Sequence, residues 1–240
     1  MKYVVADIHG CYEEYMELMQ KIKLSDVDHL YILGDTLDRG PEPMKVLLDI
    51  MHRQNVTYII GNHDYLFLYF IRKLGLDLSK VENMSEEDII DFQAYLEDGG
   101  LSSIKAFMKL TAEEKQAVCI FLEEANVYDD VIVGGKRYVL VHAGISSFCE
   151  DKVLDEYDLL DFICERTDYS RRYYQDTNTY VITGHTPTMC INTDSSSNVY
   201  IGNGHIAIDC GCAYGGKLAA YCIEDGAITY IDAKEDGGNL

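Results

Sequence analysis

Residues 33–40 read Leu-Gly-Asp-Thr-Leu-Asp-Arg-Gly, so two carboxylates and a guanidinium follow directly on an apolar run. That run, at 30–33, has the length and composition of a strand buried on both faces. Polar residues follow four further runs of the same kind, at 3–6, 56–60, 138–141 and 180–183. Helix-period stretches separate the first three runs, which predicts a β-α-β-α-β segment with parallel strands and an α/β fold. Ligands bind beyond the carboxyl ends of such strands, so the sequence predicts a site at this edge.

Composition and charge limit the class of protein. The chain has 240 residues, 48% of them hydrophobic, and a net charge of −21. A chain this acidic repels phosphate backbones and anionic membranes, which argues against general nucleic-acid binding and membrane partners but leaves room for a local phosphate site. No stretch approaches the ~20 apolar residues of a membrane span, and the apolar run at 3–6 is too short for a signal-peptide core. We therefore expect a cytoplasmic protein with reduced cysteines.

The remaining regions differ from the strand-rich parts. Helices are expected at 12–22 and 44–51, between the first three strands. From Tyr65 to Asn126 the chain has only charged, helix-period stretches, at 66–74, 86–96 and 113–124, which predicts a mostly helical insertion of about 65–126 over the sheet edge. Later segments predict a helix and loop at 159–174, and short strands with turns at 202–204 and 225–226.

Six side chains able to bind a metal follow the predicted strands. They are Asp7, His9, Asp35, Asn62, His142 and His185. A mixed set of carboxylates, imidazoles and an amide suits Mn, Fe or Zn. Six donors exceed the needs of one tetrahedral metal and fit two metals about 3.5–4 Å apart that share a carboxylate. Any one of them could be an ordinary core, capping or turn residue, and only their recurrence at every predicted strand end indicates a site.

Other candidate ligands are assigned structural roles. His29, His52 and His205 do not follow predicted strands. The pair Cys210-Gly-Cys212 lacks the two-residue spacer of a zinc knuckle or redox motif. By contrast, Gly34, Gly61 and Gly184 each directly precede a candidate ligand, where the backbone is expected to turn sharply or pass close to the cluster.

Five motifs resemble those of the calcineurin-like metallophosphoesterases and run in the same order. They are Asp7-Ile-His9-Gly10, Gly34-Asp35-Thr-Leu-Asp38-Arg39-Gly40, Gly61-Asn62-His63-Asp64, Val141-His142-Ala-Gly144 and Gly184-His185-Thr186. More narrowly, they are similar to the phosphoprotein phosphatase branch, which includes bacterial serine/threonine phosphatases and symmetrical dinucleoside tetraphosphatases. Residues 208–218 also resemble the C-terminal strand region of the bacterial members. One departure is Asp64, where many members have Glu. The resemblance implies a single domain over 1–240, with two mixed sheets packed as a sandwich and flanked by helices.

The resemblance also implies a role for each metal donor. Asp35 would bridge two metals. Asp7 and His9 would complete the first site, and the second would be completed by Asn62, His142 and His185.

The resemblance implies that the phosphoryl group is handled by a separate set of side chains. His63 would be the general acid, with Asp38 hydrogen-bonded to one of its ring nitrogens. Arg39 would direct its guanidinium at phosphate oxygens. A second arginine is expected, and Arg166 best resembles the family position, with Arg171 and Arg172 as alternatives.

The implied reaction is hydrolysis of phosphomonoesters by direct attack of a hydroxide held between two metal ions, without a covalent enzyme intermediate. Mn is the expected metal, with Fe or Zn as alternatives. The first hypothesis is a serine/threonine protein phosphatase acting on a phosphorylated protein or peptide. The second is a bis(5'-nucleosyl)-tetraphosphatase acting on a nucleotide polyphosphate. The third is a binding module that keeps the metals as a scaffold, although His63, Asp38 and Arg39 would then serve no purpose. The native metal, the substrate and the oligomeric state stay open.

The insertion is expected to form a helical cap that contributes to substrate choice, because its first residues leave from the mouth of the site. The alternative is that it only shields the sheet edge. Phe67, Tyr69 and Phe70 could stack on an adenine, pack against a peptide, or belong to the core.

Overall fold

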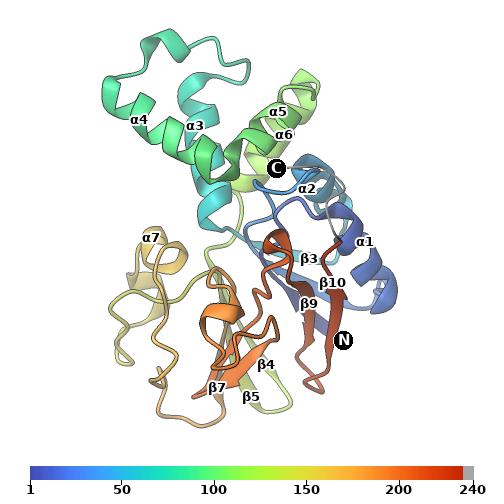
Figure 1. Cartoon of the computed structure of the whole chain (residues 1–240). Helices are drawn as coiled ribbons and strands as arrows, with labels where there is room; N and C mark the ends of the chain where they lie inside the picture. The colour runs from blue at the N-terminus through green and yellow to red at the C-terminus, as the bar shows by residue number, and fades with distance from the viewer. Residues whose placement is uncertain (235–240) are drawn as a thin grey trace.

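Two mixed sheets of five strands each dominate the computed structural model, which describes residues 1–234 (Figure 1). The first sheet has the order β10-β9-β1-β2-β3, with bounds Ile228–Asp232, Lys217–Cys222, Lys2–Val5, His29–Leu33 and Val56–Ile59. The second has the order β4-β5-β6-β8-β7, with bounds Tyr128–Val133, Lys136–Val141, Thr179–Thr183, His205–Ala207 and Tyr200–Gly202. The implied fold of two mixed sheets flanked by helices is confirmed.

Successive side chains of a strand point to opposite faces of the sheet, and in the first sheet both faces are packed. Val4 of β1 packs in a cluster with Leu140 of β5 and Ile182 of β6, so this cluster lies between the sheets. The next residue, Val5, points to the opposite face and packs with the helices. A strand buried on both faces has no polar alternation, which is why these strands read as continuous apolar runs.

The predicted parallel pairing is confirmed for the first three strands, since β1 pairs with β2 and β2 with β3 in parallel. The two later predicted strands, β5 and β6, are also parallel to each other but belong to the second sheet. Two expected helices, α1 (Tyr12–Lys21) and α2 (Pro43–His52), pack on the outer face of the first sheet. The short helix α7 (Leu159–Ile163) packs with the outer face of the second, and an irregular segment follows it.

The segment between β3 and β4 is helical and rises above the sheets in Figure 1. It contains α3 (Asn62–Leu74), α4 (Glu86–Tyr95), α5 (Leu101–Phe107) and α6 (Ala112–Glu123), and α5 was not predicted. Ser85 and Thr111 begin α4 and α6 as N-caps, each accepting the N–H of the residue three positions on. A π-helical turn at Leu96–Gly100 joins α4 to α5, and Gly99 there has φ 105°.

This helical segment shares its core with α1, α2 and the first sheet. Phe67 and Phe70 are both almost fully buried in that core, so they are not available for stacking on a substrate, whereas Tyr69 is 42% exposed. After α6 the chain returns to the sheet edge, where Asn126 exchanges backbone hydrogen bonds of 2.9 Å with Tyr58 and Ile60. The segment therefore covers the edge strand β3 as well as rising above it.

The tail forms two hairpins, with turns at the two expected positions, but they join different sheets. β7 and β8 pair antiparallel in the second sheet, and β9 and β10 in the first. None of the helices in residues 1–234 is both long and apolar enough to cross a membrane.

Candidate active site

The loops after the strands hold their side chains on an unusual backbone. Six non-glycine residues of the predicted site have φ between 44° and 67°. They are Asp7, His9, Asp35, Asp38, Arg39 and His185. Left-handed backbone costs a non-glycine residue of order 1–3 kcal/mol and persists only where its surroundings enforce it. The loops after β1 and β2 enforce it on each other, because His9 N–H donates to Asp35 O at 2.9 Å and Gly40 N–H donates to His9 O at 2.9 Å.

Two glycines are required by the close approach of backbone to carboxylates. A Cβ on Gly61 would lie 2.1 Å from Asp35 Oδ1, and a Cβ on Gly184 would lie 2.1 Å from Asp7 Oδ2. The expected close passage of the chain at these glycines is therefore found. Any side chain at either position would displace a carboxylate of the site.

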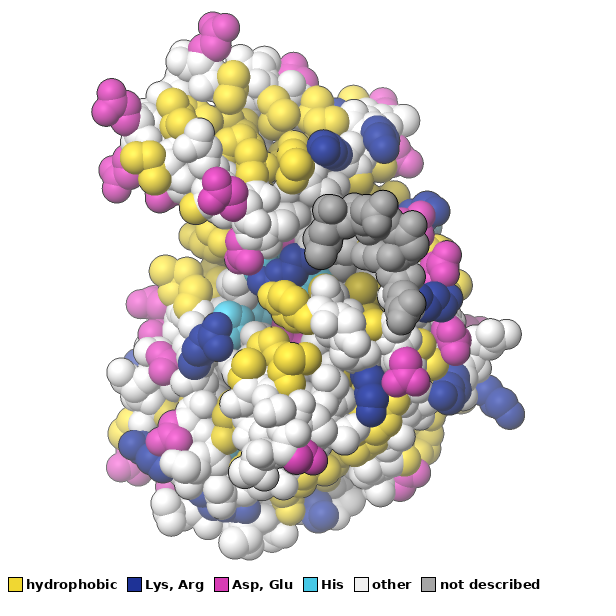
Figure 2. All heavy atoms as spheres, viewed as in Figure 1, with side chains coloured by type: hydrophobic (Ala, Val, Ile, Leu, Met, Phe, Trp, Pro, Cys, Tyr) yellow, Lys and Arg dark blue, Asp and Glu magenta, His cyan; other side chains and the backbone are white. Residues whose placement is uncertain are grey.

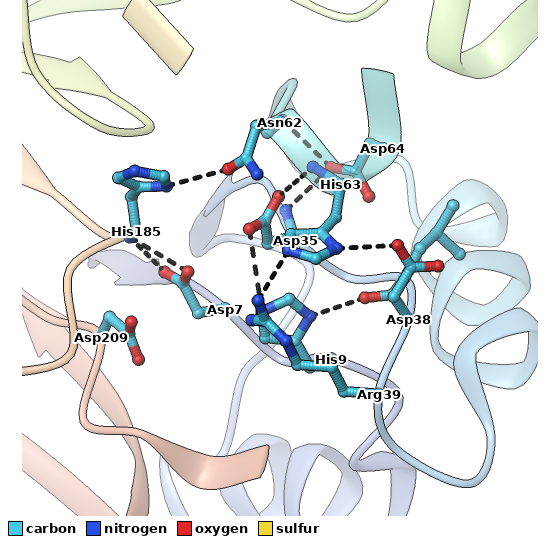
Figure 3. A network of polar contacts seen from close by, with 12 residues as sticks. Asp7, His9, Asp35, Asp38, Arg39, Asn62, His63, Asp64, His185 and Asp209 are labelled. Carbon is cyan, nitrogen blue, oxygen red and sulfur yellow. Dashed lines mark hydrogen bonds and ion pairs between the residues drawn. The ribbon is translucent and has the colours of Figure 1, made fainter. Parts of the chain in front are cut away.

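Asp35 lies at the centre of the cluster and is 2% exposed (Figure 3). Its Oδ2 is 3.7 Å from His9 Nε2 and 3.5 Å from His142 Nε2, and its Oδ1 accepts the N–H of His63 at 2.9 Å. Although burial opposes ionisation of Asp35, the neighbouring imidazoles, that of His142 foremost, lower its pKa. A charged carboxylate between two imidazole nitrogens has the placement that a bridging ligand requires.

Hydrogen bonds orient two histidines so that one ring nitrogen of each faces Asp35. Nδ1 of His9 lies 2.7 Å from Leu37 O, and Nδ1 of His142 lies 2.6 Å from Leu33 O. A carbonyl can only accept, so each Nδ1 carries a proton, and in the neutral ring Nε2 then has the lone pair. Burial lowers the pKa of His9 to about 3, which keeps the ring neutral. Neutral imidazoles with a free Nε2 are the form that binds a metal ion.

The second side of the cluster centres on Asn62. Its Oδ1 lies 2.9 Å from His142 Nε2 and 2.9 Å from His185 Nδ1. The sequence placed Asn62 and His63 at a strand end, but they form the first turn of α3, with Gly61 as its N-cap. Burial lowers the pKa of His185 to about 4, so this ring too is neutral.

Asp7 belongs to neither of the two groups of close donors that contain Asp35. These groups, each with ligand atoms within 4.8 Å of one another, are His9, Asp35 and His63, and Asp35, His142 and His185. The Asp7 carboxylate instead accepts the backbone N–H of His185, at 3.0 and 2.9 Å. Asp35 alone belongs to both groups, as a shared ligand would. The chemistry of the donor set therefore fits two metal ions, with Asp7 at the margin of the cluster.

Asp209 was not predicted as a site residue. It is 4% exposed and lies beside Asp7 in Figure 3. Burial raises the pKa of Asp209 to about 6, and the charge of Asp35 adds to the shift. Burial and the charge of Asp209 raise the pKa of Asp7 as well. The signal for Asp209 was present, because it follows the apolar run 206–208 as the other carboxylates follow theirs.

His63 and Asp38 form the predicted hydrogen-bonded pair. Nδ1 of His63 lies 2.8 Å from Asp38 Oδ2. Asp38 has two further partners from the helical segment, because Tyr95 Oη donates to its Oδ1 at 2.9 Å and Ser103 Oγ accepts its N–H at 2.7 Å. Burial raises the pKa of Tyr95 far above its ordinary value, which keeps the hydroxyl a donor. Neither Tyr95 nor Ser103 was predicted, since no local pattern relates them to Asp38.

Arg39 lies across the mouth of the cluster. Its Nη1 is 2.5 Å from His9 Nε2 and its Nη2 is 2.8 Å from His63 Nε2. A guanidinium only donates, so His63 Nε2 accepts and Nδ1 carries the proton directed at Asp38. Burial opposes protonation of His63, but the charge of Asp35 and the bond to Asp38 together raise its pKa. Arg39 also lies over the ring of Tyr214, with Cζ 5.1 Å from the centroid.

Asp64, at the position where many family members have Glu, is held by its own set of hydrogen bonds. The carboxylate is fully buried and its Oδ2 accepts Asp35 N–H at 2.8 Å and Gly61 N–H at 3.1 Å. The hydroxyl of Tyr58 donates to the same oxygen at 2.8 Å. Burial, with the charge of Asp35, raises the pKa of Asp64 to about 6. Asp64 thus fastens the start of α3 to the loop that carries Asp35.

A cleft of about 430 Å³ opens at the site, and six of the ten predicted site residues line it, whereas Asp7, His9, Asp38 and His142 do not. Asp35, His63 and Arg166 are among the side chains that line it. Figure 2 shows histidine side chains in a hollow between the helical segment and the sheets. Of the other two candidate arginines, Arg172 is occupied elsewhere, donating to Asp176 O at 2.9 Å. Arg171 lines a different hollow, which Arg166 also reaches. Arg166 is therefore the candidate that the fold brings to the cleft.

Known proteins resemble this chain along most of its length. It is 26% identical over 243 residues to an asymmetrical bis(5'-nucleosyl)-tetraphosphatase of Geobacillus sp., which covers 91% of this chain and 88% of that protein. A symmetrical bis(5'-nucleosyl)-tetraphosphatase of Buchnera aphidicola is 37% identical over 87 residues, which are 35% of this chain and 31% of that protein.

Solved structures share the fold at lower identity. A candidate diadenosine tetraphosphatase superposes with a TM-score of 0.62 at 17% identity, covering 97% of this chain and 93% of the other. A protein serine/threonine phosphatase from Saccharomyces cerevisiae, similar to human PP5, gives 0.62 at 13% identity, with coverages of 98% and 80%.

The family model of the calcineurin-like phosphoesterases matches residues 3–218, the span that carries both sheets' strand-end loops and the cleft between them. Members of this family hydrolyse phosphoric esters with the help of two metal ions, and the donor set around Asp35 fits that chemistry. This chain belongs to the calcineurin-like phosphoesterase family and is a metal-dependent phosphoric ester hydrolase.

Proposed function

We propose that this protein hydrolyses dinucleoside tetraphosphates such as diadenosine tetraphosphate. The observation that carries the substrate is the similarity to asymmetrical bis(5'-nucleosyl)-tetraphosphatases over nine-tenths of the chain, from Geobacillus sp. at 26% and from Halalkalibacterium halodurans at 27% identity. The serine/threonine protein phosphatase, our first hypothesis from the sequence, has weaker support, because the yeast phosphatase at 13% identity shares the fold alone. The nucleotide substrate is therefore the better supported of the two.

The residues that would hold the metals are the six predicted donors. They are Asp7, His9, Asp35, Asn62, His142 and His185. Carboxylate oxygens with imidazole nitrogens suit Mn, which we propose as the metal. Two such ions would supply Lewis-acid stabilisation of the phosphoryl oxygens and a nucleophile at neutral pH.

The chain's own side chains would bind and protonate the substrate. Arg39 and Arg166 line the cleft and would pair with phosphate oxygens, which suits a planar guanidinium. With the Arg39 guanidinium turned to phosphate, Nε2 of His63 could be protonated and would give that proton to the leaving oxygen, while Asp38 holds the ring through Nδ1. The helical segment 65–126 shares a core with α1 and α2, which supports a single domain in which this segment forms one wall of the site.

A substrate panel with added Mn²⁺ tests the proposal. It compares an aryl phosphomonoester, a phosphothreonine peptide and diadenosine tetraphosphate, and separates the nucleotide products by chromatography. We expect kcat/KM to be highest for the tetraphosphate, with ATP and AMP as the products of asymmetrical cleavage or ADP alone for symmetrical cleavage. Asp35→Asn serves as the inactive control for contaminating hydrolases. A kcat/KM that is highest for the phosphopeptide would overturn the proposal in favour of the protein phosphatase.

A further inference from the structure

A second hollow, which we call the α3–α4 groove, lies between helices α3 and α4. It measures about 420 Å³, and its aromatic lining comes from Tyr65, Tyr69, Phe70 and Tyr95. The rings of Phe70 and Tyr95 are stacked, with centroids 5.2 Å apart, and both are buried. Tyr69 is 42% exposed and lies at the rim. Figure 2 shows hydrophobic side chains gathered on this helical part of the molecule, above the hollow that contains the histidines.

The α3–α4 groove adjoins the cleft through one residue. Asp98 lines both of them, and its carboxylate is 3.3 Å from Arg39 Nη2 and 3.5 Å from His63 Nε2. Tyr95 is a second link, because its ring lines the groove while its hydroxyl donates to Asp38 at 2.9 Å. A molecule whose phosphate lies against Arg39 could therefore extend past Asp98 into the groove.

The lining of the groove selects against a phosphate and for a flat, uncharged group. Its ionisable side chains are two carboxylates, Asp91 and Asp98, together with three tyrosines. No lysine or arginine lines it among the described residues. The ammonium of Lys73 lies at its rim, where it is paired with Asp88, donates to the Tyr69 hydroxyl at 3.0 Å and lies 5.2 Å from the centroid of the Tyr69 ring, which leaves the opposite face of that ring for a ligand. Aromatic walls bind planar rings by stacking, and carboxylates accept hydrogen bonds from amino groups. A base with an exocyclic amino group has both properties.

We propose that the α3–α4 groove binds the purine base at one end of the polyphosphate substrate, with Tyr69 as its exposed stacking partner. This inference rests on the proposed function, because it takes the substrate to be a nucleotide. It makes Tyr69 a specificity-determining residue that is separate from the hydrolytic side chains. The base would gain affinity from the groove while the phosphates are held at Arg39.

The test uses a pair of ligands that share a triphosphate chain and differ by the nucleoside. Hydrolysis of an aryl phosphate by the Mn²⁺-loaded protein is inhibited with ATP and with inorganic tripolyphosphate. Stacking on one aromatic side chain corresponds to a gain of about tenfold in affinity. We expect Tyr69→Ala to weaken inhibition by ATP about tenfold and to leave inhibition by tripolyphosphate within about twofold. Tyr69→Phe keeps the stacking face and should keep the wild-type inhibition by ATP.

The same variants are then assayed on the proposed substrate. Tyr69→Ala should raise the KM for diadenosine tetraphosphate about tenfold, with little change in kcat. Ile90→Ala is the matched control, since Ile90 is a 65% exposed side chain of α4 that does not line the groove.

The two proposals fail in distinguishable ways. A wild-type protein that hydrolyses diadenosine tetraphosphate, with unchanged ATP inhibition and KM in Tyr69→Ala, overturns the groove alone. A wild-type protein that does not hydrolyse the tetraphosphate overturns the proposed function. If Tyr69→Ala loses affinity for a phosphothreonine peptide but not for ATP, the groove binds a peptide side chain and the proposed base site is wrong.

Discussion

The two halves of the site are supported from different parts of the molecule. Asp35 and the histidines around it are held by the loops of the sandwich itself, through backbone hydrogen bonds and glycines that leave no room for a Cβ. Asp38 is held from the helical segment, by Tyr95 and Ser103, which are 57 and 65 residues away in the chain.

The first turn of α3 belongs to the metal side, since it carries Asn62 and its Asp64 accepts the N–H of Asp35. Beyond that turn, the helical segment contacts Asp38 and Arg39, which we propose for proton transfer and phosphate binding. Changes on the two sides should therefore have separable effects.

Asp35→Asn should have the largest effect. It removes the charge that lies between His9 and His142 and leaves a neutral amide in place of the one carboxylate common to both groups. A metal cluster supplies several kcal/mol of transition-state stabilisation, so we expect kcat/KM to fall about 10³-fold or more together with the bound metal. Steady-state kinetics and metal analysis measure both. Asp26→Asn, at an exposed position, is the control.

His63→Asn should separate the halves. The variant should keep its metals and lose roughly 10²–10⁴ in kcat on alkyl phosphates, the usual contribution of a general acid. The loss should be smaller on nitrophenyl phosphate, whose leaving group needs no proton, and intermediate on a nucleotide substrate. His52→Asn, on the exposed end of α2, is the control. Equal losses on alkyl and aryl phosphates would show that His63 is not the acid.

Tyr95→Phe tests the contribution of the helical segment. It removes one hydrogen bond to a charged carboxylate, an interaction worth about 1.5–3 kcal/mol when complete. Since the effect passes through Asp38 to His63, we expect about a threefold to tenfold loss of kcat on alkyl phosphates and less on aryl phosphates. Tyr157→Phe is the control, because its hydroxyl bonds the backbone of Cys149, outside the cleft. An equal loss of kcat on alkyl and aryl phosphates would show that Tyr95 has only a structural role.

Asp98→Asn should have the smallest effect. The carboxylate is 62% exposed and lies 3.3 Å from Arg39, where it competes with a phosphate. Exposed ion pairs are worth at most about 1 kcal/mol, so the KM for an aryl phosphate, which has no base to bond Asp98, should fall by no more than about fivefold. Glu97→Gln, at the exposed neighbouring position, is the control. A rise in KM would mean that Asp98 orients Arg39 for substrate instead of competing with it.

The sequence predicts those strands and helices that have a clear local pattern of apolar residues. The strands that end at Asp7 and Asp35 are continuous apolar runs because they are buried on both faces. Strand β4 was not predicted, because it is an edge strand with two aspartates, Asp129 and Asp130, and has no continuous apolar run. Helix α5 was not predicted either, because it has only seven residues and follows a π-helical turn. Hydrogen-bond pairing between distant segments decides which strands form each sheet, and local hydrophobic periodicity does not predict that pairing.

The candidate site divides in the same way. Its donors follow strands or glycines and were recognisable from position, while Tyr95 and Ser103 act over a long sequence separation. Asn62 and His63 were recognisable as well, but their place in the first turn of α3 depends on the capping contact of Asp64 with Gly61. The sequence next to a site does not indicate the side chains of distant elements that hydrogen-bond to it.

Metal content measured together with activity tests the central claim most directly. The protein is stripped with a chelator, reloaded with increasing Mn²⁺, and assayed on diadenosine tetraphosphate at each step, with bound metal determined by mass spectrometry. The account predicts no activity without metal, full activity at about two ions per chain, and no recovery in Asp35→Asn. Full activity in the metal-free protein would contradict it.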